Sequence, residues 1–177
     1  MIREKVAQAL NQQFNKELFS AYFYLGMSAQ SESLGLRGAS HWFMAKHAEE
    51  LAHAMKIYRY LLDQGSEVTL GGVDKPEQGW GSLAEMLERT LEHEKQVTER
   101  VNSLMDVAMG EHDHATQIFL HWFVTEQIEE EATVNDLISR LKLVGGKDEG
   151  LYLIDNELEK IAARLNAGNQ PTTTTSG

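Results

Sequence analysis

The sequence lacks cysteine altogether and has only two prolines among its 177 residues. Without thiols it has no disulfide framework, no cysteine-based zinc or iron–sulfur site and no thiol catalysis. It also lacks an apolar run of about 18 residues, the length that spans a bilayer. Its first residues are charged and contain no apolar signal segment. The sequence therefore predicts a cytoplasmic protein with no membrane partner.

Positive charge is scarce as well, with 16 Lys and Arg against 27 Asp and Glu and a formal net charge of −11. Such an excess repels the phosphate backbone of nucleic acids and concentrates cations near the protein. We therefore expect no nucleic-acid partner. With 42% hydrophobic residues, the chain can bury the core of one ordinary globular domain.

Glycine and proline divide the chain into five segments with helical periodicity. The pattern predicts helices over about residues 4–33, 36–64, 82–109, 114–141 and 147–166. These segments define one domain over residues 1–166. The tail, 167–177, is rich in Thr and has little to bury, which predicts disorder.

The lengths of the connections predict the topology. Short breaks around Gly35 and Gly110 indicate antiparallel neighbours, whereas residues 65–81 are too many for a tight turn. A 28-residue helix is about 42 Å long, and 17 extended residues reach about 56 Å. The long link can therefore run from one end of a bundle to the other. We predict an all-α fold, a four-helix bundle with one long crossover and a short fifth C-terminal helix.

Each of the four long helices has an apolar stripe that polar side chains interrupt near its middle. Because helix midpoints share one height whichever way the helices run, these side chains should meet in one layer. Several like charges in an apolar interior are costly unless they are protonated or neutralised by cations. An oxygen-rich set with one imidazole suits iron or manganese. The interrupting residues are Glu17, Glu50 with His53, Glu94, and Gln127 with Glu130.

These residues and spacings resemble the ferritin family, specifically its haem-free bacterial type, over about residues 1–166. The resemblance implies a ferroxidase centre that binds two iron ions, Fe(II) before oxidation and Fe(III) after it. Glu17, Glu50 and His53 are implied at one iron. Glu50 bridges to the other iron, where Glu94 and Glu130 complete the implied ligands.

The same resemblance implies further roles beside this centre. Gln127 matches a glutamine that hydrogen-bonds next to the site. The acidic run 126–131 is similar to a bacterial pattern with a third iron site nearby. The implied ligands of that third site are Glu49, Glu126, Glu129 and the shared Glu130.

Two aromatic residues have alternative interpretations. Tyr24 lies two helical turns after Glu17 on the same face, so it can hydrogen-bond a ligand carboxylate. The resemblance also implies that Tyr24 donates an electron during oxygen reduction. Trp122 is either a secondary donor or a packing residue. The remaining histidines fall outside the layer and are interpreted as surface or packing residues, namely His41, His47, His93, His112, His114 and His121.

The sequence differs from the related bacterioferritins at residues that bear on haem binding. Bacterioferritins have a second Glu-x-x-His where this chain has Gln127 and Glu130. Their haem-ligating methionine follows the bridging glutamate, and Leu51 stands there instead. The comparison predicts a protein without haem.

The resemblance implies iron storage and detoxification. Fe(II) would be oxidised with oxygen or peroxide, and Fe(III) would be kept as a mineral inside a homo-oligomeric shell of 24 subunits. The apolar stripe of the fifth segment would then be buried between subunits; it consists of Leu151, Ile154, Leu158, Ile161 and Leu165.

Two alternatives stay open at this point. The first is a di-iron or di-manganese oxidase of an organic substrate, which Glu130 disfavours because that class usually has a second histidine there. The second is a non-catalytic bundle, which leaves the shared carboxylate layer unexplained.

Overall fold

The computed structural model describes residues 2–145 and 148–168. Within these ranges it contains five helices and no strand, and the helices are α1 (Glu4–Ser33), α2 (Arg37–Asp63), α3 (Leu83–Gly110), α4 (His114–Leu143) and α5 (Asp148–Gly168). The predicted bounds are correct to within two residues wherever they fall on described residues. Ala167 and Gly168 belong to α5 although they fall in the predicted tail. The rest of that tail lies outside the described residues, as does residue 147. None of these helices has both the length and the hydrophobicity of a membrane-crossing segment.

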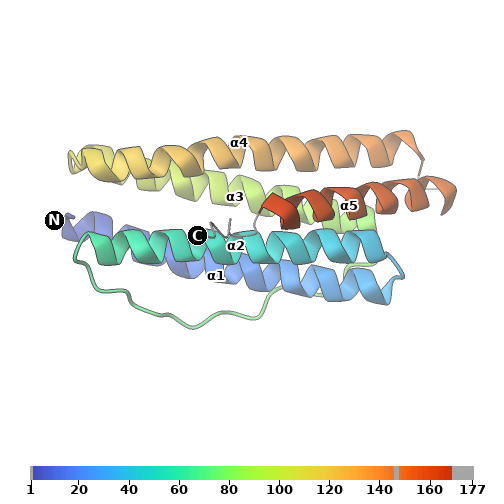
Figure 1. Cartoon of the computed structure of the whole chain (residues 1–177), viewed down its shortest axis with the longest axis horizontal. Helices are drawn as coiled ribbons and strands as arrows, with labels where there is room; N and C mark the ends of the chain where they lie inside the picture. The colour runs from blue at the N-terminus through green and yellow to red at the C-terminus, as the bar shows by residue number, and fades with distance from the viewer. Residues whose placement is uncertain (1, 146–147, 169–177) are drawn as a thin grey trace, which may run out of the picture.

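The helices form a bundle of two antiparallel hairpins, α1–α2 and α3–α4 (Figure 1). The link between Asp63 and Leu83 runs along the outside of the bundle, so α2 and α3 run in the same direction. The predicted four-helix bundle with one long crossover is confirmed.

A glycine after α1 and a serine before α3 allow local hydrogen bonds that define the ends of these helices. At the end of α1, Gly35 has φ 76°, and the Leu36 amide donates to the carbonyl of Ser31 at 2.9 Å. This left-handed turn satisfies the last carbonyls of the helix and reverses the chain. At the start of α3, the hydroxyl of Ser82 accepts from the Glu85 amide at 3.2 Å, which satisfies an orphan amide of the first turn.

Two asparagines of α1 hold the first half of the crossover against the bundle. The Asn11 side chain donates to the Glu67 carbonyl at 3.1 Å and accepts from the Thr69 amide at 2.8 Å. Asn15, one turn later, donates to the Thr69 carbonyl at 2.9 Å and accepts from the Gly71 amide at 2.6 Å. These contacts give the extended backbone the partners that a helix or sheet would otherwise supply.

The apolar core is split into two clusters. One includes Phe14 and Ile57, and the other includes Tyr24 and Phe43. Along each of the four long helices, the interrupting polar residues fall between the members of one cluster and those of the other. This arrangement confirms that the polar interruptions lie in the middle of the bundle.

The fifth helix packs on its own bundle, contrary to the expectation that its apolar stripe is buried between subunits. Ile154 and Leu158 are buried within the single chain and belong to the same core cluster as Tyr24. The Asp155 carboxylate accepts hydrogen bonds from the amides of Gly38 and Ala39 at 3.1 and 2.8 Å. It therefore caps the start of α2, whose first amides lack partners within the helix.

Gly38 is a point of close contact between α2 and α5, and it provides a test of this packing. A Cβ atom there would lie 1.8 Å from the Asp155 carbonyl oxygen. We expect Gly38→Ala to displace α5 and to lower the free energy of unfolding by about 1–3 kcal/mol, as overpacked sites do. Thermal and urea unfolding would measure the change.

The matched control is Gly110→Ala at the end of α3, where an added Cβ meets no atom within 4 Å. That change should leave stability equal or raise it by about 0.5–1 kcal/mol. Equal effects of the two substitutions would contradict the close packing of α5 on α2.

Candidate metal centre

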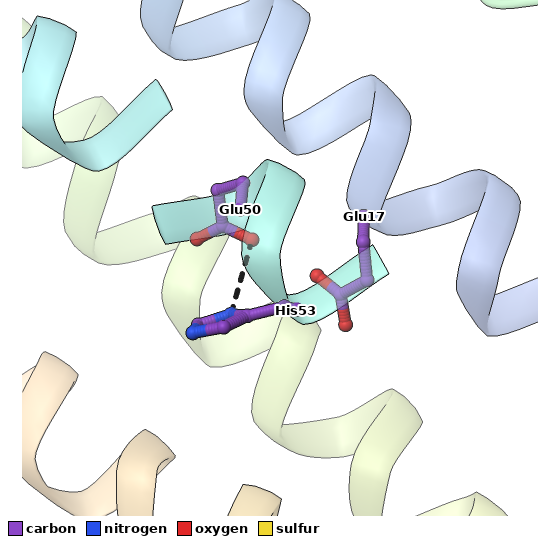
Figure 2. Close-up of side chains that lie close together, drawn as sticks. All are labelled: Glu17, Glu50 and His53. Carbon is purple, nitrogen blue, oxygen red and sulfur yellow. Dashed lines mark ion pairs between the residues drawn. The ribbon is translucent and has the colours of Figure 1, made fainter. Parts of the chain in front are cut away.

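Two helices of the first hairpin bring three predicted ligands together at the middle of the bundle. Glu17 comes from α1, and Glu50 and His53 come from successive turns of α2 (Figure 2). One donor atom from each of the three lies within 4.8 Å of the others. The His53 Nδ1 atom is 3.6 Å from Glu50 Oε2. The Glu-x-x-His spacing thus places both side chains on one face of α2, opposite Glu17.

The oxygen atoms of this triplet are only partly satisfied by the protein. Glu17 Oε1 accepts a hydrogen bond from the side-chain amide of Gln13, Nε2, at 2.7 Å. Glu17 Oε2 and Glu50 Oε2 are buried and have no hydrogen-bond partner. Unpartnered buried carboxylate oxygens are costly, and a divalent cation among them would supply the missing partner. The donors present therefore suit a hard or borderline metal ion.

Without a metal, the layer favours the protonated state of these glutamates. Burial raises the pKa of Glu17 well above its usual value, and the nearby Glu50 raises it further. Burial and the charge of Glu94 raise the pKa of Glu50 to about 8, although Lys46 opposes this shift. Both carboxyl groups therefore hold a proton more tightly than an exposed glutamate does, and a metal ion would have to displace it.

Glu94 of α3 is held by two donors in the structure. The Tyr24 hydroxyl donates to Glu94 Oε1, and the Gln127 side chain donates to Glu94 Oε2 at 3.1 Å. Burial, followed by the charge of Glu94, raises the pKa of Tyr24 well above its usual value, so the phenol stays protonated and donates. The hydrogen-bonding roles predicted for Tyr24 and Gln127 agree with these contacts.

Glu130 of α4 makes an ion pair that sequence reasoning missed. The ammonium group of Lys46, on α2, contacts Glu130 Oε1 and lies 3.2 Å from Glu49 Oε2. Burial lowers the pKa of Lys46, but Glu130 and Glu49 raise it, and the pKa ends well above the usual value. The layer is thus neutralised in part by a cation of the protein itself, a lysine that the sequence analysis did not place there.

The donor atoms predicted for the second iron lie farther apart than those predicted for the first. Among the described residues, no other three His, Asp or Glu side chains bring donor atoms as close together as Glu17, Glu50 and His53. Glu94 and Glu130 occupy the same layer, but their oxygens face Tyr24, Gln127 and Lys46.

Three of the four residues predicted for a third site are more exposed than the buried Glu130, which belongs to the layer itself. Glu49 and Glu126 are half-buried, and Glu129 is exposed. Burial raises the pKa of Glu126, and the charges of Glu130, Glu49 and Glu129 add to that shift. Trp122 borders His53 edge-to-face, with ring centroids 5.2 Å apart, and so packs the imidazole from the α4 side.

Two further groups with shifted pKa values lie near the layer. Arg100 of α3 is half-buried, and burial lowers its pKa while Glu17 and Glu94 oppose that shift. His93 was expected to be a surface or packing residue, and the packing alternative is confirmed: the imidazole is buried and stacks on Phe23, with Nε2 2.9 Å from the Ser20 hydroxyl. Burial and the positive charge of Arg100 lower the pKa of His93 to about 3, so this imidazole is neutral.

The chain is similar to known ferritins along most of its length. Residues 7–144 match the family model of the ferritin-like domain. The bacterial non-heme ferritin of Campylobacter jejuni is 39% identical over 162 residues, which cover 92% of this chain and 97% of that protein. The bacterial non-heme ferritin of Escherichia coli O157:H7 is 37% identical over 162 residues, 91% of this chain and 98% of that protein. A solved open-pore ferritin from the archaeon Archaeoglobus fulgidus has a TM-score of 0.88 and 42% identity over 90% of this chain and 98% of its own.

The pKa of Glu50 predicts how the stability of the metal-free protein depends on pH. Glu50 keeps its proton in the folded state up to a pKa of about 8, against a usual value of 4.5. Between these values the folded state binds more protons than the unfolded state, so the free energy of unfolding falls as pH rises. One such group contributes up to about 1.4 kcal/mol per pH unit. Urea unfolding across this pH range would measure the slope.

Glu50→Gln removes the titrating group, so its slope should be smaller than that of the unsubstituted protein. The control is Glu88→Gln, at an exposed position of α3, which should keep the original slope. If Glu50→Gln keeps that slope as well, Glu50 is not protonated in the folded metal-free protein.

Proposed function

This chain belongs to the ferritin family, and we propose that it stores iron by oxidising Fe(II) at the carboxylate layer and retaining Fe(III) as a mineral. The observation that carries this proposal is the buried triplet of Glu17, Glu50 and His53, in which two carboxylate oxygens lack hydrogen-bond partners. The names of the bacterial non-heme ferritins to which the chain is similar support iron storage.

Iron is the substrate in this proposal, and the protein supplies the ligands. Glu17, Glu50 and His53 would hold one Fe(II), and Glu50, Glu94 and Glu130 would hold a second, with a third beside Glu49, Glu126 and Glu129. Two Fe(II) ions each lose one electron, and O₂ accepts both electrons with two protons to give hydrogen peroxide. Anionic oxygen ligands favour the higher charge of Fe(III), so the layer promotes oxidation. Peroxide could replace O₂ as oxidant.

Tyr24 and Gln127 would position Glu94 during this reaction. Both side chains donate hydrogen bonds to the Glu94 carboxylate, which fixes its orientation toward the layer. Residues that orient metal ligands in this way contribute to affinity and activity. Electron donation by Tyr24 or Trp122 stays a prediction from the family resemblance.

Retention of Fe(III) requires an enclosed space, since Fe(III) released into bulk solution precipitates. We therefore propose that the protein assembles into a homo-oligomeric shell, with 24 subunits as the resemblance implies. A cytoplasmic location and the absence of haem likewise stay predictions.

The ligand assignment predicts the effect of removing Glu94. We expect Glu94→Ala to lower the rate of aerobic Fe(II) oxidation by at least about tenfold, the lower bound observed when even supporting residues of metal sites are lost. Stopped-flow absorbance after mixing Fe(II) with metal-free protein would measure the rate. Glu88→Ala, at an exposed position of the same helix, is the control and should oxidise iron normally. Equal rates in both variants would show that Glu94 is not a ligand.

Retention distinguishes storage from oxidation of an organic substrate. After aerobic addition of many Fe(II) ions per chain, we expect the iron to co-elute with a large oligomer in gel filtration and the particle to sediment far faster than a 19.9 kDa chain. A monomer that oxidises iron and releases it would contradict storage and favour the oxidase interpretation.

A further inference from the structure

Lys46 is the one lysine among the described residues that is fully enclosed in the core, with 2% of its surface exposed. It lies on α2 one turn before Glu50, so its side chain points into the same layer as the predicted ligands. Its ammonium group contacts Glu130 Oε1 and lies 3.2 Å from Glu49 Oε2. A positive charge of the protein therefore stands inside the proposed metal centre.

The two carboxylates held by Lys46 are ones that later metal ions would need. Glu130 is the α4 ligand of the proposed second iron and is shared with the proposed third, for which Glu49 is a further ligand. A buried ammonium group requires anionic partners, and a metal ion at the same oxygens would both take those partners and repel the lysine. Lys46 and a cation at Glu130 thus compete for one carboxylate.

The first position has no such competitor. The ammonium group of Lys46 makes no ion pair with Glu17 or Glu50, and each of these glutamates keeps one buried oxygen without a hydrogen-bond partner. A metal ion can bind to Glu17, Glu50 and His53 while the pair of Lys46 and Glu130 stays intact.

Lys46 also has a way out of the layer. Its second partner, Glu49, retains 15% of its side-chain exposure and lies toward the surface. A lysine side chain has four flexible methylene groups and readily extends its charged end toward water. Movement of the ammonium group past Glu49 would release Glu130 without unfolding α2.

We propose that Lys46 is a positioning residue that acts as an internal counter-ion and sets the order of metal binding. One divalent ion binds first at Glu17, Glu50 and His53, and a further ion binds at Glu130 only after the ammonium group leaves. This inference rests on the proposed metal centre and adds to it a regulation by a residue of the chain itself.

The test is a calorimetric titration of metal-free protein with Zn²⁺, which is not oxidised, so that binding is measured apart from activity. For the unsubstituted chain we expect one tight site and a second that is weaker. In Lys46→Met, which keeps an unbranched apolar side chain one atom shorter than lysine but removes its charge, the second affinity should rise by about tenfold or more, equivalent to about 1.4 kcal/mol. The first affinity should change far less.

The matched control is Lys142→Met, which removes the same charge from an exposed position on α4 and should bind Zn²⁺ as the unsubstituted chain does. The metal-free Lys46→Met protein should also melt at a lower temperature than Lys142→Met, because Glu130 and Glu49 lose their counter-ion. Saturating Zn²⁺ should restore much of that difference.

Crystals of the unsubstituted chain soaked with one and with three equivalents of Zn²⁺ make the test independent of whether Lys46→Met folds. At one equivalent, anomalous maps should show zinc only at Glu17, Glu50 and His53, with Lys46 still paired with Glu130. At three equivalents, they should show zinc at Glu130 as well, with Lys46 displaced. Identical isotherms for Lys46→Met and the unsubstituted chain, or zinc at Glu130 with Lys46 still bound, would overturn the role of Lys46 only. Absence of zinc from the layer in the unsubstituted chain would overturn the proposed centre as well.

Discussion

The concentration of carboxylates at one height of the bundle is the constraint on which the rest of the structure depends. Glu17, Glu50, Glu94 and Glu130 are all buried, and the apolar core is divided into two clusters on either side of them. Such a layer is tolerated only because protons, neutral donors and a buried ammonium group compensate its charge. The remaining unpartnered oxygens are the ones that a metal ion would satisfy.

The two hairpins contribute unequally to this layer. The α1–α2 hairpin carries the complete triplet of Glu17, Glu50 and His53, joined by a tight turn at Gly35. The α3–α4 hairpin contributes Glu94 and Glu130, and the long crossover brings it alongside the first. Asn11 and Asn15 fasten that crossover to α1 at several points. The proposed first metal position therefore lies within one hairpin, and the proposed second position depends on the docking of the two hairpins.

Periodicity explains why so much of the fold was predictable. Apolar residues three and four apart indicate helices and their inward faces, and the interruptions indicated the polar layer. Lys46 lies in the α2 stripe, between Phe43 and Glu50, but lysine is usually exposed, so its burial could not be predicted from residue type. The placement of α5 was wrong for a different reason. An amphipathic stripe shows that a face is covered, but it does not show whether the same chain or another subunit covers it, and the close approach at Gly38 is visible only in three dimensions.

The charge balance of the layer also bears on how oxidised iron would leave it. In the proposed reaction, oxidation adds one positive charge at each iron ion while the protein ligands stay the same. At this stage Lys46 is displaced from Glu130 but remains part of α2, and the added charge repels its ammonium group more strongly. Once the ion departs, Glu130 is again free to pair with that ammonium group. Glu126 and Glu129, which are more exposed than Glu130, offer the next anionic oxygens toward the surface. The internal cation would therefore both delay the arrival of a second ion and favour the departure of the product, because it restores its own ion pair when the layer empties.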